Sequence, residues 1–110
     1  MFEKIKLTVS DCRAIADSVM RNADAAIQSV KEHHDPMMDG KSAVLFLLYD
    51  RLRSKLNLEN DMLKPIEGAK SHAEALELRI REIIEYFSDN PNDCSQCFKE
   101  VDVKVLNAKG

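Results

Sequence analysis

The residues with most chemical potential in this chain are two cysteines, spaced as Cys94-Ser-Gln-Cys97. A C-x2-C pair can place two thiolates on one zinc ion, but a structural zinc site takes four ligands. The others would have to come from Cys12, from a histidine or from a second subunit. A thioredoxin-like redox pair would follow a strand and begin a helix, whereas we expect this pair to follow a proline-containing turn and precede a strand. The spacing therefore favours incidental thiols in a turn, with a zinc site or a redox-responsive pair at Cys94 and Cys97 as alternatives.

The histidines give weaker signals. His33 and His34 are adjacent, so on a helix they point about 100° apart and would not easily share one metal ion. A histidine at the end of a helix is also stabilised there by the helix dipole when it is protonated. We therefore expect His33 to be a partly buried terminal residue and His72 to be solvated.

Sequence motifs of catalysis are missing from the chain. It contains no G-x-S-x-G, H-E-x-x-H, G-x-G-x-x-G or Walker A sequence. Its carboxylates fall mainly on helix faces that we expect to be solvated. We therefore expect no enzyme, and we assign no catalytic or cofactor-binding residues.

Charge is distributed unevenly along the 110 residues, although the net charge is only −3. Residues 41–70 hold six basic and four acidic groups, and residues 71–100 hold three and seven. The basic zone consists of Lys41, Arg51, Arg53, Lys55, Lys64 and Lys70. An excess of +2 is too small for a nucleic-acid surface. It favours a solvated face, or one that steers an acidic partner.

The clearest structural element is a helix at residues 71–87. Ser71 and Glu74 form a Ser-x-x-Glu capping box. Apolar residues then recur three or four positions apart, which places them on one face of a helix: Ala73, Leu76, Ile80, Ile83 and Phe87. The other face is charged, so this helix has one side to bury.

Two further helices are expected at residues 10–34 and 41–57. The first has an alanine-rich seam, with Ser10 or Asp11 as its N-cap. The second, capped by Asp39 or Ser42, is apolar nearly all round from Val44 to Tyr49. That stretch should lie in the centre of the fold or at a subunit contact. Residues 59–69, interrupted by Pro65, predict a short or kinked connecting helix.

Strand patterns occur near both ends of the chain. Residues 3–8 alternate imperfectly, as a short strand or an extended lead-in would. Val101, Val103 and Val105 alternate with polar residues and predict a strand at 100–106. Because one strand is not stable alone, it would pair with the N-terminal strand, a second subunit or a partner protein.

These elements predict one mainly α domain over residues 1–110, an antiparallel three- to four-helix bundle with an optional two-stranded β ribbon from the chain ends. The function expected is that of a non-enzymatic interaction or regulatory protein that contacts an unidentified protein and forms a homodimer. The residues expected at contacts are Val44, Leu45, Leu48, Tyr49, Arg51, Lys55, Val101, Val103 and Val105.

The location expected is the cytoplasm, with reduced thiols, because the N-terminus lacks the apolar segment of an export signal. The longest apolar run, Ala43–Tyr49, is seven residues. That is far short of the 18 or so that a membrane span needs, so no membrane partner is expected.

Overall fold

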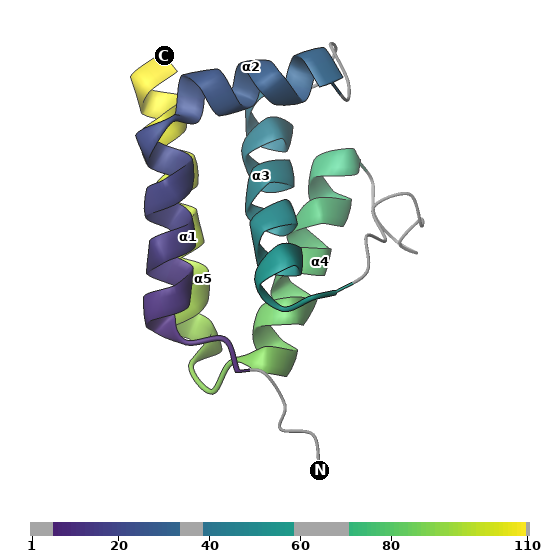
Figure 1. Ribbon diagram of the computed structural model, residues 1–110, viewed down its shortest axis with the longest axis vertical. Helices are drawn as coiled ribbons and strands as arrows, with labels where there is room; N and C mark the ends of the chain where they lie inside the picture. The colour runs from purple at the N-terminus through teal and green to yellow at the C-terminus, as the bar shows by residue number, and fades with distance from the viewer. Residues whose placement is uncertain (1–5, 34–38, 59–70, 110) are drawn as a thin grey trace.

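The protein is mainly helical, as the sequence predicts. The structure, a computed structural model, describes residues 6–33, 39–58 and 71–109. Within these residues it contains no strand and five helices: α1 (Val9–Arg21), α2 (Ala23–His33), α3 (Gly40–Lys55), α4 (His72–Phe87) and α5 (Pro91–Lys109). Helices α1 and α5 run side by side in the same direction, α3 and α4 run the opposite way, and α2 crosses one end (Figure 1). The arrangement therefore differs from a simple up-and-down bundle, in which neighbours alternate.

Helix α3 is the centre of the fold. Every residue from Ser42 to Tyr49 is buried, as is Leu52 one turn later. The helix packs against each of the other four, which agrees with a sequence that is apolar nearly all round. Core packing within one chain is therefore enough to cover Val44–Tyr49.

Helix α4 has the predicted bounds and the predicted cap. The Ser71 hydroxyl accepts a hydrogen bond from the backbone N–H of Glu74, at 3.1 Å. Its most deeply buried apolar residues are Leu76, Ile80 and Ile84. Ile84 was not part of the predicted stripe, while Ile83 is only half-buried. The buried face thus includes Ile84 rather than Ile83.

The prediction of a single helix at residues 10–34 is wrong, because the chain bends at Asn22 and continues as α2. Asparagine is a weak helix former, and its side chain competes for backbone hydrogen bonds. Here Asn22 ends α1, and its carbonyl accepts from the N–H of Ala26, at 2.8 Å, to begin α2. The bend lets α2 pack across α3, which buries Ile27 and Val30.

The N-cap of α1 is Thr8, so the prediction of Ser10 or Asp11 is wrong by two or three residues. The Thr8 hydroxyl accepts from the N–H of Asp11, and the Asp11 carboxylate accepts from the N–H of Thr8, both at 3.0 Å. This reciprocal pair is a capping box in which aspartate takes the usual place of glutamate. At α3 the predicted cap Asp39 is confirmed, accepting from the N–H of Ser42 at 2.7 Å.

The Asp11 cap predicts a pH dependence of stability. The hydrogen bond from the Thr8 backbone lowers the pKa of Asp11 below 3.8, its ordinary value, against a smaller opposing effect of burial. A carboxyl whose folded pKa is depressed stabilises the fold above its unfolded pKa, and this contribution is lost as the pH falls through the folded pKa. We expect Asp11→Asn to cost about 1 kcal/mol at pH 7 and clearly less at pH 2.5.

Urea unfolding at the two pH values measures this difference. Asp17→Asn is the matched control, because Asp17 is exposed on the same helix and forms no hydrogen bond or ion pair with a described residue. An equal cost for Asp11→Asn at both pH values would contradict the assigned role of the carboxylate.

The strand predicted at residues 100–106 is wrong, because these residues lie within α5. Val101 and Val105, four positions apart, are buried, while Val103 between them is 57% exposed. The buried face continues back through Phe98, Cys97 and Cys94, which is a helical spacing. The alternating valines are thus one stretch of a longer helical pattern. No β ribbon forms among the described residues.

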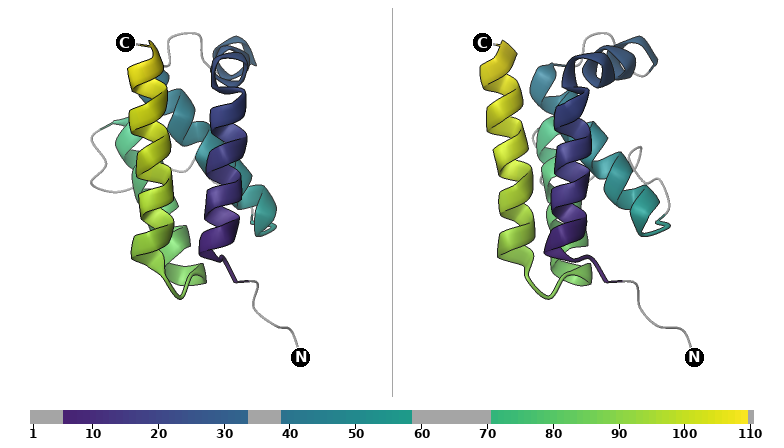
Figure 2. Two further views of the ribbon diagram at one scale, coloured as in Figure 1. Left: turned by 90° about the vertical axis from the view of Figure 1, so that its left-hand side faces the viewer. Right: turned by 60° about the vertical axis from the view of Figure 1, so that its left-hand side comes forward.

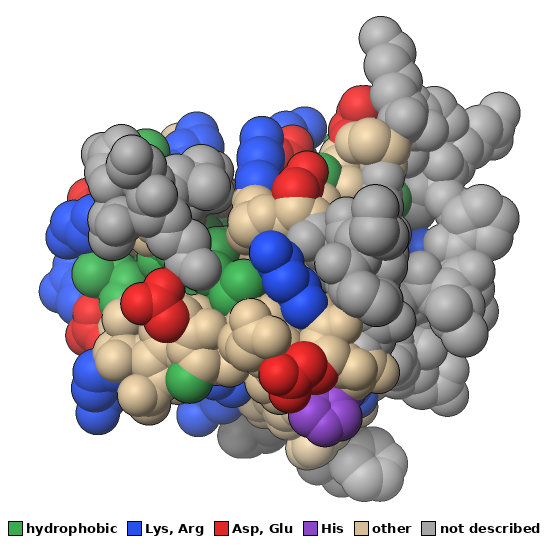
Figure 3. Space-filling view, turned by 90° about the horizontal axis from the view of Figure 1, so that it is seen from above, with side chains coloured by type: hydrophobic (Ala, Val, Ile, Leu, Met, Phe, Trp, Pro, Cys, Tyr) green, Lys and Arg blue, Asp and Glu red, His purple; other side chains and the backbone are tan. Residues whose placement is uncertain are grey.

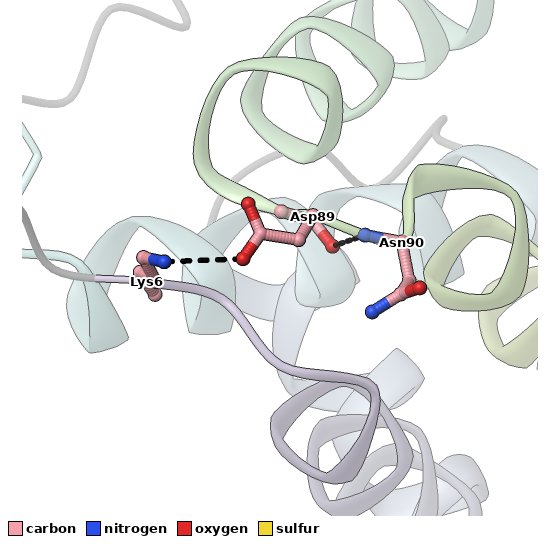
Figure 4. Close-up of polar contacts among 4 residues, drawn as sticks. Lys6, Asp89 and Asn90 are labelled. Carbon is pink, nitrogen blue, oxygen red and sulfur yellow. Dashed lines mark hydrogen bonds and ion pairs between the residues drawn. The ribbon is translucent and has the colours of Figure 1, made fainter.

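The N-terminal segment is tied to the α4–α5 turn instead. Lys6–Thr8 has no regular structure, and the rest of the predicted strand at 3–8 lies outside the described residues. Leu7 is buried, and its N–H donates to the carbonyl of Phe87 at 3.0 Å. Lys6 forms an exposed ion pair of 3.1 Å with Asp89 (Figure 4). Such an exposed pair contributes little, so burial of Leu7 is the main anchor.

The connecting helix predicted at residues 59–69 lies outside the described residues. None of the described helices combines the length and the apolar character that crossing a membrane requires.

Candidate binding groove between α4 and α5

A groove of about 650 Å³ lies between α4 and α5 and over α3. Its floor is apolar and comes from all three helices: Leu45, Leu48, Ile80, Ile84 and Phe98. These floor residues are themselves almost fully covered by their neighbours. A ligand would therefore gain little from burying them, and the walls must provide most of its contacts.

The walls of the groove are polar. Helix α4 contributes Glu77, Arg81 and Glu85, which follow one another at four-residue spacing and so lie along one side of the helix. Helix α5 contributes Asn92, Ser95, Gln96 and Lys99. A partner that lay in the groove would meet charges on both sides and amide and hydroxyl groups on the α5 side.

The groove exists because its two helices pack mainly against other elements. The short turn Ser88–Asn90 joins α4 to α5. From there α4 packs chiefly on α3 and α5 packs chiefly on α1, while α4 and α5 contact each other much less. Two further views show α5 lying against α1 along its length (Figure 2). The separation between α4 and α5 is thus built into the core packing.

The charged side chains at the groove differ in whether a described residue neutralises them. Glu77 forms an ion pair of 3.1 Å with Lys41 of α3. Arg81, Glu85 and Lys99 form no ion pair with any described residue. The groove lining includes neither histidine nor cysteine. This set of side chains is suited to recognition of a complementary charged surface.

The predicted contact residues fall in three environments. Six of them are buried within the single chain: Val44, Leu45, Leu48, Tyr49, Val101 and Val105. Of these, Leu45 and Leu48 also line the floor of the groove. Arg51 is half-buried, and Lys55 and Val103 are exposed. That these residues contact a partner stays a prediction. The groove walls were missed, because only the packing of α5 shows that they face one another.

The predicted basic zone is largely neutralised where the structure describes it. Arg53 pairs with Asp50 at 2.8 Å, and Lys55 lies 3.7 Å from Asp11. Lys64 and Lys70 lie outside the described residues. The face seen from above in Figure 3 carries basic and acidic side chains interspersed, without an area of one sign. This pattern differs from the basic patch of a nucleic-acid-binding domain.

The three cysteines lie on α1 and α5, two helices that pack against each other. Cys12 of α1 and Cys94 and Cys97 of α5 are all buried and all free thiols. The Ser88 hydroxyl lies 3.1 Å from the Cys94 sulfur. Burial raises the pKa of the Cys12 thiol well above its usual value, and the neighbouring Cys94 adds to this rise. Among the described residues, no group of three or more potential ligands is arranged to hold a metal ion.

The turn predicted for Cys94 and Cys97 is therefore wrong, since both lie in the first turns of α5. His33 is the last residue of α2 and is exposed rather than partly buried. Its ring nitrogen Nδ1 lies 2.9 Å from the carbonyl of Ser29, one turn earlier. This local contact accounts for His33 without a ligand.

Comparison with known protein families, with curated proteins and with solved structures finds no match to this chain. Its described residues define it as a small helical protein with a groove between α4 and α5.

Proposed function

We propose that this protein is a non-enzymatic interaction protein that forms a homodimer through the groove between α4 and α5. The observation that carries the proposal is the presence of two opposite charges on the groove wall, Arg81 and Glu85, that form no ion pair with any described residue. The partner in this dimer is a second copy of the same chain. The sequence-based expectation was also a homodimer, but with its contact on the helix face at residues 44–55 and on the valine strand; the contact proposed here is on α4.

The charge order on α4 is self-complementary. Two copies related by a two-fold axis that is perpendicular to α4 and passes beside it, level with residue 83, bring their α4 helices together in antiparallel directions. Arg81 then lies opposite Glu85 of the partner subunit, and the symmetry repeats this pair. A parallel arrangement would instead oppose like charges, which is unfavourable. The charges thus select one orientation.

The polar walls set the strength of the contact. Because the apolar floor is already covered, association gains little from the hydrophobic effect and depends on the groove rim. Rim ion pairs between exposed groups are worth no more than about 1 kcal/mol each and are screened by salt. We therefore expect a weak dimer, in exchange with monomer, that dissociates further as salt is added.

Sedimentation velocity over a wide range of protein concentration tests this pairing through a charge exchange. Arg81→Glu and Glu85→Arg each oppose like charges twice in the dimer, so each should weaken dimerisation by about 10-fold or more. The double variant R81E/E85R restores both pairs with reversed polarity. Its dimerisation should return to nearly that of the wild type.

Glu82→Arg is the matched control for Glu85→Arg, since Glu82 is exposed on the same helix and is not part of the groove lining. It makes the same change in net charge and should leave dimerisation nearly unchanged. A wild type that stays monomeric at every concentration would overturn the proposal. A double variant as weak as the single ones would exclude the antiparallel pairing of α4.

A further inference from the structure

The chain segment before α1 is attached to the end of α4, close to one end of the groove. Its two residues Lys6 and Leu7, which we call the N-terminal latch, have no regular structure, yet Leu7 is 1% exposed. The Leu7 N–H donates to the carbonyl of Phe87, the last residue of α4, at 3.0 Å. Lys6 reaches Asp89 in the turn that follows (Figure 4). The latch therefore contacts the chain at the end of α4 and just beyond it.

From these contacts we propose that the N-terminal latch is a conformational device that controls the groove. When it is docked it holds the last turn of α4 in place, and when it is released that turn frays, since helices fray from their ends. Glu85 lies in this last turn and is one of the two charges on which the dimer depends. Release of the latch thus displaces Glu85 and weakens the dimer, a consequence that rests on the dimer proposed above.

The start of α5 is fixed by bonds that do not involve the latch. The Ser88 hydroxyl accepts from the N–H of Asn90 at 3.0 Å and lies 3.1 Å from the sulfur of Cys94, which is fully buried. The Asn90 carbonyl accepts from the N–H of Cys94 at 3.1 Å. These bonds persist when the latch is released. The latch therefore acts on the α4 wall of the groove and leaves the α5 wall in place.

The latch can be released without unfolding the protein, because few contacts hold it. The ion pair of Lys6 joins two exposed side chains and contributes little, so Leu7 is the main anchor. The next residue, Thr8, belongs to the capping box of α1 and keeps that helix intact. Segments with few buried contacts open more often than the whole protein unfolds. We expect the Leu7 N–H to exchange at least about 10-fold faster than the core amides of α3.

Hydrogen exchange of the native full chain, followed by NMR at low and high protein concentration, tests the coupling. If the dimer requires the docked latch, dimerisation must also favour the docked latch, because coupling between two equilibria is reciprocal. Protection of the Leu7 N–H should therefore rise by about 3-fold or more as the dimer forms. The matched control is the end of α2, residues 31–33, which also opens locally but lies at the opposite end of the molecule (Figure 1). Its protection should stay constant.

Leu7→Ala, studied by sedimentation velocity, tests the same coupling from the latch side. Loss of a buried leucine side chain should leave the latch mostly released. Because both subunits must dock their latches to associate, we expect dimerisation to weaken by about 10-fold. Ile27→Ala is the matched control, since Ile27 is 2% exposed on α2, which contributes nothing to the groove lining. It should lower the overall stability similarly and leave dimerisation nearly unchanged.

Two results would overturn the latch while the dimer stands. One is a wild-type dimer in which protection of the Leu7 N–H does not change with concentration, and the other is a Leu7→Ala variant that dimerises as well as Ile27→Ala. A wild type that stays monomeric would overturn the dimer instead. In that monomer, amides 85–87 that exchange no faster in Leu7→Ala than in the wild type would overturn the latch as well. The wild-type exchange decides the question by itself if Leu7→Ala does not fold.

Discussion

Replacement of Leu48 by aspartate is expected to unfold the protein rather than to separate subunits. Leu48 is 1% exposed on α3, the helix that contacts every other described helix. A carboxylate there loses its water without gaining a partner, and the leucine packing is lost as well. We expect a loss of at least about 4 kcal/mol, most of what holds together a domain of this size. Circular dichroism and urea unfolding measure the loss directly.

The matched control for Leu48→Asp is Val103→Asp. Both residues were expected at contacts and both changes introduce the same charge, but Val103 is 57% exposed. We expect its variant to unfold within about 0.5 kcal/mol of the wild type, apart from a small difference in helix propensity. A Leu48→Asp chain that kept its helical content and its unfolding midpoint would show that Leu48 lies outside the core.

The sequence predicted α3 and α4 well because local and tertiary signals agree there. Each has a side-chain cap that the structure confirms, Asp39 and Ser71. Each also has an apolar pattern long enough to exclude a strand. The run from Val44 to Tyr49 further predicted a central position, since a helix that is apolar on all sides must be covered on all sides.

The bend at Asn22, in contrast, could not be predicted from the spacing of apolar residues. The alanine-rich seam from residue 9 to residue 30 fits one long helix as well as two, because a bend of the axis leaves the spacing of apolar residues intact. Only the position of α3 favours the bend, by offering a surface to Ile27 and Val30. That position is a property of the whole fold, which a local pattern does not contain.

Predicting the groove and the burial of Cys94 and Cys97 required α5 to be recognised as a helix. The sequence pattern instead predicted a turn and a strand there. Cys12 lies on the predicted seam of the first helix, so its burial could be expected. The burial of Cys94 could not, since Cys94 was placed in a turn. With residues 91–105 taken as a helix that begins at Pro91, a favoured first position, Cys94, Cys97 and Val101 fall on one buried face. Pro91 was thus the residue in the sequence that could have indicated the start of this helix.

Proline at position 103 tests the helical assignment of α5 most directly. Val103 lies well inside α5, where proline would remove a backbone hydrogen bond and clash with the preceding turn. We expect Val103→Pro to lower the free energy of unfolding by about 3 kcal/mol, measured by urea unfolding. Val103→Ala is the control at the same exposed site.

The effect of Val103→Ala on the free energy of unfolding distinguishes a helix from a strand at residues 100–106. Alanine is a better helix former than valine, so Val103→Ala should stabilise a helix by a few tenths of a kcal/mol. In a strand the β-branched valine is preferred, and the same change should destabilise. A proline that destabilises together with an alanine that stabilises would fit a helix through 100–106. A tolerated proline and a harmful alanine would instead indicate an edge strand at residues 100–106.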